Sequence, residues 1–125
     1  MKKILIIDDD AQIRSMLRRT LERSGYEVRE ADNGRVGRET LETYAAELII
    51  CDIVMPEEEG IGTIRTVART HPHLKIIAVS GGSLTTEQYL SHATKFGAHR
   101  AFKKPFSLKE VVEAVRQLLG ETVPA

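Results

Sequence analysis

Short apolar runs alternate with helix-like patterns along the whole chain, and this alternation limits the possible folds more than any other feature. The pattern predicts five strands, at Lys3–Asp8, Tyr26–Ala31, Leu48–Asp52, Lys75–Ser80 and Arg100–Lys103. Repeated strand–helix units build a parallel sheet that helices cover on both faces. With 125 residues the chain has the length of one domain, which we expect over residues 1–120 with a short tail at 121–125.

The composition of the strands indicates their order in the sheet. The runs Ile4–Ile7, Leu48–Cys51 and Ile76–Val79 are continuously apolar, as expected for central strands that are buried on both faces. By contrast, Tyr26–Ala31 alternates apolar and charged residues, which is typical of an edge strand. We therefore expect an α/β fold with a five-stranded parallel sheet in the order 2-1-3-4-5.

Two helices have clear signatures. The last one should begin at a capping box formed by Ser107 and Glu110 and stop at Gly120. The first should begin at Asp10, whose side chain is expected to cap it. Its inward-facing side chains are predicted to be Ile13, Met16, Leu17 and Leu21. Weaker patterns predict three more helices, near 36–44, 61–70 and 86–96.

The charge balance argues against some classes of partner. Eighteen basic residues offset eighteen acidic ones, so no general positive field exists to attract nucleic acid. The first apolar run stops at Asp8, far short of a signal-peptide core or a membrane span. We expect a cytoplasmic protein without direct nucleic-acid or membrane partners. The single cysteine, Cys51, is expected to be a core residue.

Acidic residues follow the strands that should meet in the middle of the sheet. Asp8, Asp9 and Asp10 close the first strand, and Asp52 closes the third. Ligands of open parallel sheets bind at the carboxyl ends of the strands, where the strand order reverses, so these carboxylates should converge. Carboxylates held this close need a cation or a proton. An all-oxygen donor set that also meets phosphate favours Mg²⁺.

The same groups suit transfer of a phosphoryl group to a carboxylate. The third strand lies between the first and fourth, which makes Asp52 the central candidate for the nucleophile. Ser80 ends the fourth strand, and Lys104 follows the fifth, where its ammonium can neutralise a phosphoryl oxygen. Asp10 is more simply explained as a helix cap than as a metal ligand.

Four motifs together resemble those of the CheY-like receiver domains of two-component response regulators. They occur in the family's order, as Ile6–Asp10, Asp52–Pro56 with Gly60, Val79–Gly81 and Lys104–Phe106. The resemblance covers almost the whole chain. It implies a flavodoxin-like, doubly wound (βα)5 sandwich that works in a phosphorelay and is not itself an enzyme.

The resemblance also implies roles for individual residues. Asp52 would be the phosphoacceptor, Ser80 the switch hydroxyl and Lys104 the lysine of a Lys-Pro motif with a cis peptide bond. The Mg²⁺ ligands would be Asp8, Asp9, Asp52 and the backbone carbonyl of Val54. The phosphodonor would be a histidine kinase or phosphotransfer protein docking near the first helix. The output would be a protein target on the surface of the fourth helix, fifth strand and fifth helix.

One position departs from the family pattern. Receiver domains usually carry an aromatic residue three positions before the motif lysine, and here that residue is Ala101. Phe102 should not replace it, because a one-residue step along a strand reverses the direction of the side chain. The sequence therefore lacks, at position 101, the aromatic side chain that usually takes part in the switch.

Two other functions fit parts of the sequence. The first is a pseudo-receiver, an interaction module with the same fold but no phosphorylation, and the complete set of acids, hydroxyl and lysine argues against it. The second is a phosphatase resembling the haloacid dehalogenase family, since Asp8-Asp9-Asp10 contains the required D-x-D. The chain lacks the residue expected after that motif and has no room for a cap.

Overall fold

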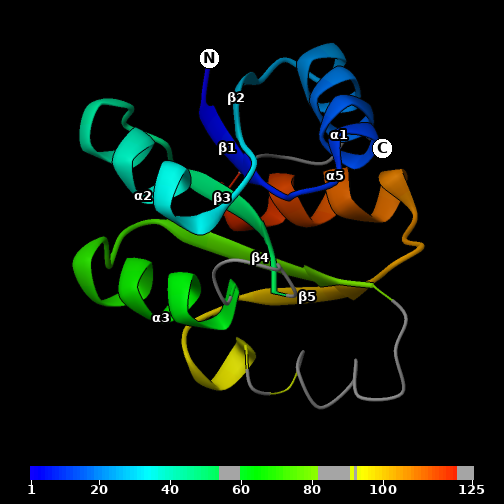
Figure 1. Cartoon of the computed structure of the whole chain (residues 1–125). Coiled ribbons are helices and arrows are strands. Elements are labelled where there is room, and N and C mark those ends of the chain that lie inside the picture. Colours follow the sequence, from blue (N-terminus) through cyan, green and yellow to red (C-terminus); the bar gives the residue numbers. More distant parts are fainter. Residues whose placement is uncertain (54–59, 82–90, 92, 121–125) are drawn as a thin grey trace.

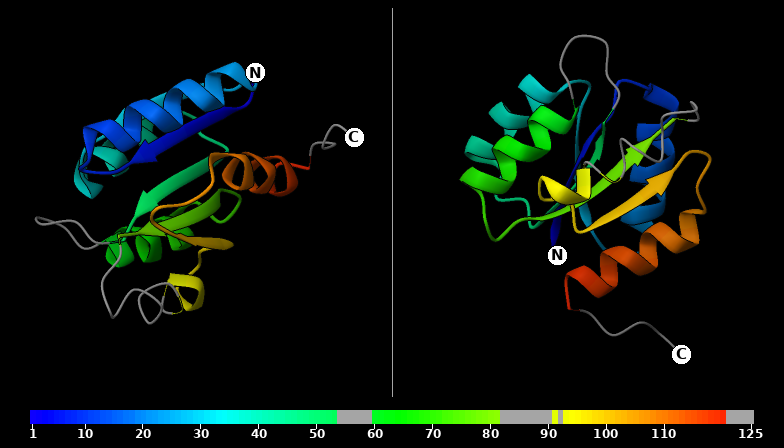
Figure 2. Two further views of the ribbon diagram at one scale, coloured as in Figure 1. Left: turned by 90° about the vertical axis from the view of Figure 1, so that its right-hand side faces the viewer. Right: turned by 90° about the horizontal axis from the view of Figure 1, so that it is seen from below.

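The computed structural model describes residues 1–53, 60–81, 91 and 93–120, and its sheet has the order β2-β1-β3-β4-β5 (Figure 1). The strands are β1 (Lys3–Ile7), β2 (Glu27–Ala31), β3 (Leu48–Asp52), β4 (Lys75–Ser80) and β5 (Arg100–Lys103). Each neighbouring pair is parallel, and the arrowheads of β1 and β3 point the same way in Figure 2. The predicted sheet and its order are confirmed.

Helices cover both faces of this sheet. Those that the structure describes are α1 (Ala11–Arg23), α2 (Gly34–Thr43), α3 (Gly60–Thr70) and α5 (Leu108–Leu118). In Figure 1, α1 and α5 lie on one face, and α2 and α3 lie on the other. The helix expected near 86–96 and the tail at 121–125 fall largely or wholly outside the described residues. Within those residues, no helix combines the length and hydrophobicity needed to cross a lipid bilayer.

The central strands fill two separate cores. In β1, Leu5 and Ile7 belong to the core under α2 and α3, whereas Ile4 and Ile6 belong to the core under α1 and α5. All four side chains are fully buried. A strand between two helical layers needs apolar side chains on both faces, which explains its unbroken apolar run. Cys51 is also fully buried, as expected.

The predicted helix caps are present. Asp10 Oδ1 accepts hydrogen bonds from the backbone amides of Gln12 and Ile13, at 2.9 and 3.3 Å. Ser107 Oγ accepts one from the amide of Glu110 at 3.2 Å. Gly120 follows α5 with a φ of 73°, a conformation that glycine adopts without strain. The caps therefore fix where α1 leaves β1 and where α5 begins and ends.

Three details of the prediction were wrong. Strand β1 ends at Ile7 rather than at Asp8, and β2 begins at Glu27 rather than at Tyr26. Met16 was expected to face the core, but 43% of it is exposed. The core face of α1 is centred near Leu17, and Met16 lies about 100° around the helix from that residue, at the edge of the stripe.

Candidate functional site

Strand pairing brings the two buried acids side by side. Residues Ile7 of β1 and Cys51 of β3 are partners in the parallel ladder, so the next residue on each strand, Asp8 and Asp52, lies at the same edge of the sheet. Only 1% of Asp8 and 3% of Asp52 are exposed. Asp9 is exposed, and one carboxylate oxygen of each of the three acids lies within 4.8 Å of the others. The predicted convergence is confirmed for these acids.

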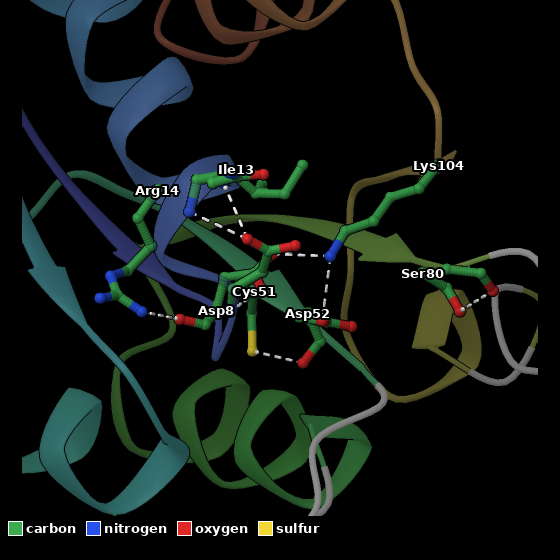
Figure 3. Close-up of polar contacts among 10 residues, drawn as sticks. Asp8, Ile13, Arg14, Cys51, Asp52, Ser80 and Lys104 are labelled. Atoms are coloured by element: carbon green, nitrogen blue, oxygen red, sulfur yellow. Dashed lines mark hydrogen bonds and ion pairs between the residues drawn. The ribbon is translucent and has the colours of Figure 1, made fainter.

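The ammonium of Lys104 bridges the two buried acids (Figure 3). Its Nζ donates to Asp8 Oδ2 at 2.9 Å and to Asp52 Oδ2 at 3.1 Å. The backbone amide of Lys104 donates to the carbonyl of Ser80 at 2.7 Å, which extends the β4–β5 pairing beyond Lys103. The peptide bond between Lys104 and Pro105 is cis, as the family resemblance implied.

The charge of Lys104 is stabilised by this arrangement. Burial by itself lowers the pKa of the ammonium, but the hydrogen bond that it donates to Asp8 and the negative charge of Asp52 outweigh this effect. The pKa of Lys104 is therefore raised above its ordinary value. A cation fixed beside Asp52 can stabilise negative charge that develops on a group bound there.

The donor set of the acids fits a hard divalent cation. Three carboxylates converge here, and the Lys104 ammonium pairs with two of them, so within the described part of the chain the acids of this cluster outnumber the ammonium paired with them. Carboxylate oxygens without imidazole or thiolate are typical of Mg²⁺ sites, where water completes the coordination. The carbonyl of Val54, the other ligand implied by the family resemblance, lies outside the described residues.

Ser80 ends β4 at the same edge of the sheet and is fully buried. Strand β4 is the neighbour of β3, with Val79 opposite Asp52. The Ser80 hydroxyl donates to the carbonyl of Gly81 at 3.4 Å. The hydroxyl is thus already hydrogen-bonded in the loop that leaves β4, and binding another acceptor would require it to rotate.

Asp10 serves the helix, as expected. Its carboxylate accepts from the first amides of α1, while its own backbone amide donates to Asp8 Oδ1 at 2.9 Å. The cap therefore also helps to orient the carboxylate of Asp8.

Ala101 and Phe102 point to opposite faces of β5. Ala101 packs against the core under α2 and α3, and Phe102 packs against the core under α1 and α5. Phe102 therefore does not occupy the place of an aromatic residue at position 101, which agrees with the strand-direction argument.

Arg14 is a residue at this site that the sequence reasoning missed. Its Nη1 donates to the backbone carbonyl of Asp8 at 2.7 Å (Figure 3). The one signal in the sequence is that an arginine in the first turn of a helix opposes the helix dipole, which an interaction outside the helix can offset.

Comparison with known proteins agrees with the family resemblance of the sequence motifs. The family model described as the response regulator receiver domain matches residues 4–116. The chain belongs to this family. It is therefore a receiver domain of a two-component response regulator.

Some relatives match this chain over nearly their whole length, and others over only a part of it. The chain is 36% identical over 118 residues to the chemotaxis protein CheY of Thermotoga maritima, covering 94% of this chain and 97% of that protein. It is also 36% identical over 121 residues to the DNA-binding transcriptional regulator NtrC of Azospirillum brasilense, but spans only 25% of that protein. A CheY-like receiver domain protein from Methanospirillum hungatei superposes with a TM-score of 0.87 at 30% identity, covering 96% of this chain and 94% of that chain.

Proposed function

We propose that this receiver domain, which we place at residues 1–120, accepts a phosphoryl group on Asp52 from a histidine kinase or phosphotransfer protein, with Mg²⁺ held by Asp8, Asp9 and Asp52. The observation that carries the proposal is the position of the Asp52 carboxylate. It lies within reach of the Lys104 ammonium and among the oxygens of two further acids. A carboxylate in such a site can act as a nucleophile, since the surrounding cations stabilise the charge of the transferred group.

The transfer exchanges one bond for another. A carboxylate oxygen of Asp52 bonds to phosphorus while the phosphorus–nitrogen bond of a phosphohistidine donor breaks, and the electron pair of that bond leaves with the imidazole nitrogen. Lys104 Nζ, which donates to Asp52 Oδ2, is placed to donate to an oxygen of the phosphoryl group. Mg²⁺, when bound, supplies further positive charge to the phosphoryl oxygens.

Phosphorylation would then act on Ser80. A phosphoryl oxygen on Asp52 offers a charged acceptor, and the Ser80 hydroxyl can exchange its hydrogen bond with Gly81 for this stronger one. We propose that this exchange changes the surface of the fourth helix, β5 and α5, which binds a downstream protein. In this account the domain acts in the cytoplasm, without binding nucleic acid itself.

Two alternatives predict different chemistry. A pseudo-receiver would bind partners without being phosphorylated. A phosphatase would use the first and third residues of Asp8-Asp9-Asp10 in catalysis, but the third, Asp10, is engaged in capping α1.

One experiment separates the three functions. The protein is incubated with acetyl phosphate and Mg²⁺, and separately with an aryl phosphate ester, and analysed by intact mass and phosphate release. The proposal predicts one added phosphoryl group and no sustained release from the ester. An unmodified folded protein would support the pseudo-receiver, and multiple turnovers of the ester would support the phosphatase.

A further inference from the structure

Arg14 connects the acidic loop to the neighbouring strand. Its Nη1 donates to the backbone carbonyl of Asp8 at 2.7 Å, and its Nε pairs with Glu30 Oε1 of β2 at 3.1 Å. The Arg14 side chain is only 18% exposed. Because both contacts use the rigid plane of one guanidinium, they fix the position of the Asp8 carbonyl relative to β2.

That carbonyl belongs to the peptide group that joins two of the proposed metal ligands, Asp8 and Asp9. The other peptide group of Asp8 is also held, since its amide donates to the carbonyl of Ala31 at 3.1 Å. The backbone on both sides of Asp8 is therefore fixed, and with it the direction of the Asp8 side chain. Holding the peptide plane also limits where the exposed Asp9 carboxylate can point.

Electrostatics alone does not explain an arginine at this position. Arg14 lies in the first turn of α1, where the helix dipole disfavours a cation. Its charge also repels a metal ion bound by the acids. Glu30 offsets this cost, and its pKa is lowered chiefly by a hydrogen bond from Arg18, with a further hydrogen bond from Arg14.

We propose that Arg14, anchored by Glu30, is a positioning residue that aims Asp8 and Asp9 at the cation before the cation binds. The inference rests on the proposed Mg²⁺ site and adds to it a residue outside the acidic cluster. In Figure 3 Arg14 approaches Asp8 from the side opposite to Lys104, so the acid is held from both directions. Positioning groups outside the ligand set change metal affinity by about 10- to 100-fold in other proteins.

The test measures Mg²⁺ affinity without any phosphodonor. The full chain, labelled with ¹⁵N, is titrated with MgCl₂ alone, and the amide shifts of residues 8–10 and 52 give the dissociation constant. Arg14→Met should weaken Mg²⁺ binding by about tenfold, the low end of the range for such groups. Arg14→Lys keeps the charge but loses the planar fork, so it should recover only part of this loss.

Arg18→Gln is the matched control. Arg18 Nη1 also pairs with Glu30, at 2.8 Å, and the substitution removes one positive charge from α1 as Arg14→Met does. Arg18 has a different partner on its Nε side, Glu22, at 3.4 Å. Arg18→Gln should therefore change the Mg²⁺ dissociation constant by less than about twofold, even where urea unfolding shows that it costs as much stability as Arg14→Met.

A charge effect and a positioning effect have opposite signs here. If Arg14 acted only through its charge, Arg14→Met would tighten Mg²⁺ binding and Arg14→Lys would leave it unchanged. Either result, or unchanged binding in Arg14→Met, overturns the inference while leaving the metal site intact. A folded natural protein that does not bind Mg²⁺ overturns both proposals.

Glu30→Gln supplies a second variant if Arg14→Met does not fold. It weakens the anchor but leaves Arg14 in place, so it should weaken Mg²⁺ binding by a smaller factor, about threefold. Where Arg14→Met does fold, the variant that combines it with Glu30→Gln should bind Mg²⁺ no more weakly than Arg14→Met alone, because both substitutions remove the same restraint. Unchanged binding in Glu30→Gln would contradict the anchoring role.

Discussion

Lys104 Nζ lies 3.1 Å from Asp52 Oδ2, although the two residues are 52 positions apart in the chain. The contact joins the end of β3 to the loop after β5, across the intervening strand β4. The same ammonium lies 2.9 Å from Asp8. Lys104 is therefore a counterion of both buried acids, and changes at this position should affect both stability and cation binding.

Removing the ammonium should destabilise the metal-free protein. Lys104→Met leaves two buried carboxylates without this partner, which costs about 3–5 kcal/mol in fully buried pairs. Because Lys104 is partly exposed, we expect about 2 kcal/mol less unfolding free energy at neutral pH. Urea denaturation measures this, and added Mg²⁺ should recover part of the loss. The control is Lys103→Met, an exposed neighbour, and an equal loss in both variants would contradict the pairing.

Alkaline pH should weaken the same contact. The raised pKa of Lys104 means that the folded state holds this proton more tightly than the unfolded state. Its contribution to stability is complete below the ordinary value of about 10.5 and is lost as pH rises through the higher folded pKa. In Lys104→Arg the charge persists, so the two proteins should diverge in urea midpoint only above that pH. Parallel profiles would count against the coupling.

The acids of the β1–α1 loop should differ in their effect on Mg²⁺. Asp9→Ala removes a proposed ligand and should weaken Mg²⁺ binding and slow phosphorylation. Asp10→Asn removes the same charge one residue later but keeps a capping oxygen for α1, so it should change Mg²⁺ affinity little. Calorimetric titration with MgCl₂ compares the variants. Similar losses in both would indicate a general charge effect rather than ligation by Asp9.

Ala101 should limit how far phosphorylation alone shifts the equilibrium between the two conformations of the domain. Moving a two-state population from 1:99 to 99:1 needs about 5.5 kcal/mol of differential interaction. A charge-assisted hydrogen bond from Ser80 supplies roughly 1.5–3 kcal/mol. Lys104 already pairs with Asp52, so only the change in that pairing adds to the total. An aromatic side chain at position 101 would ordinarily contribute more by burial, and alanine cannot.

The expected response to a phosphoryl mimic is therefore partial. Beryllofluoride should move the amide resonances of residues 81–103 only part of the way toward those of the fully switched conformation. Binding of a partner should complete the change. Ala101→Tyr should deepen the response, and Ser80→Ala should nearly abolish it. A complete shift in the natural sequence without a partner would show that the aromatic residue is not needed.

The strand bounds were predicted correctly where an apolar run could be read only as a buried strand. The bounds of β3, β4 and β5 agree residue for residue with the sequence prediction, because each run is bounded by polar or turn residues. The errors lie where a local pattern competes with packing. Met16 has helical spacing with Ile13, but the sheet and α5 cover only the stripe around Leu17 and Leu21.

The sequence predicted which acids converge at the proposed site, but not the contacts that hold those acids in place. Asp8 and Asp52 end adjacent strands, so strand order alone brings them together. The two contacts of Lys104 and the hydrogen bond from Arg14 to the Asp8 carbonyl depend on the path that each long side chain takes across the loops. The hydrophobic periodicity of the sequence does not encode that path. The register of β1 and β2, which places Glu30 opposite Ile6 and within reach of Arg14, also emerges only in three dimensions.

Asp52 is the proposed phosphoacceptor, and intact mass spectrometry after treatment with acetyl phosphate and Mg²⁺ tests this assignment. Asp52→Asn is nearly isosteric and should fold, while lacking the nucleophilic carboxylate. We predict one phosphoryl adduct on the natural protein and none on Asp52→Asn. A full-yield adduct on folded Asp52→Asn would contradict the assignment.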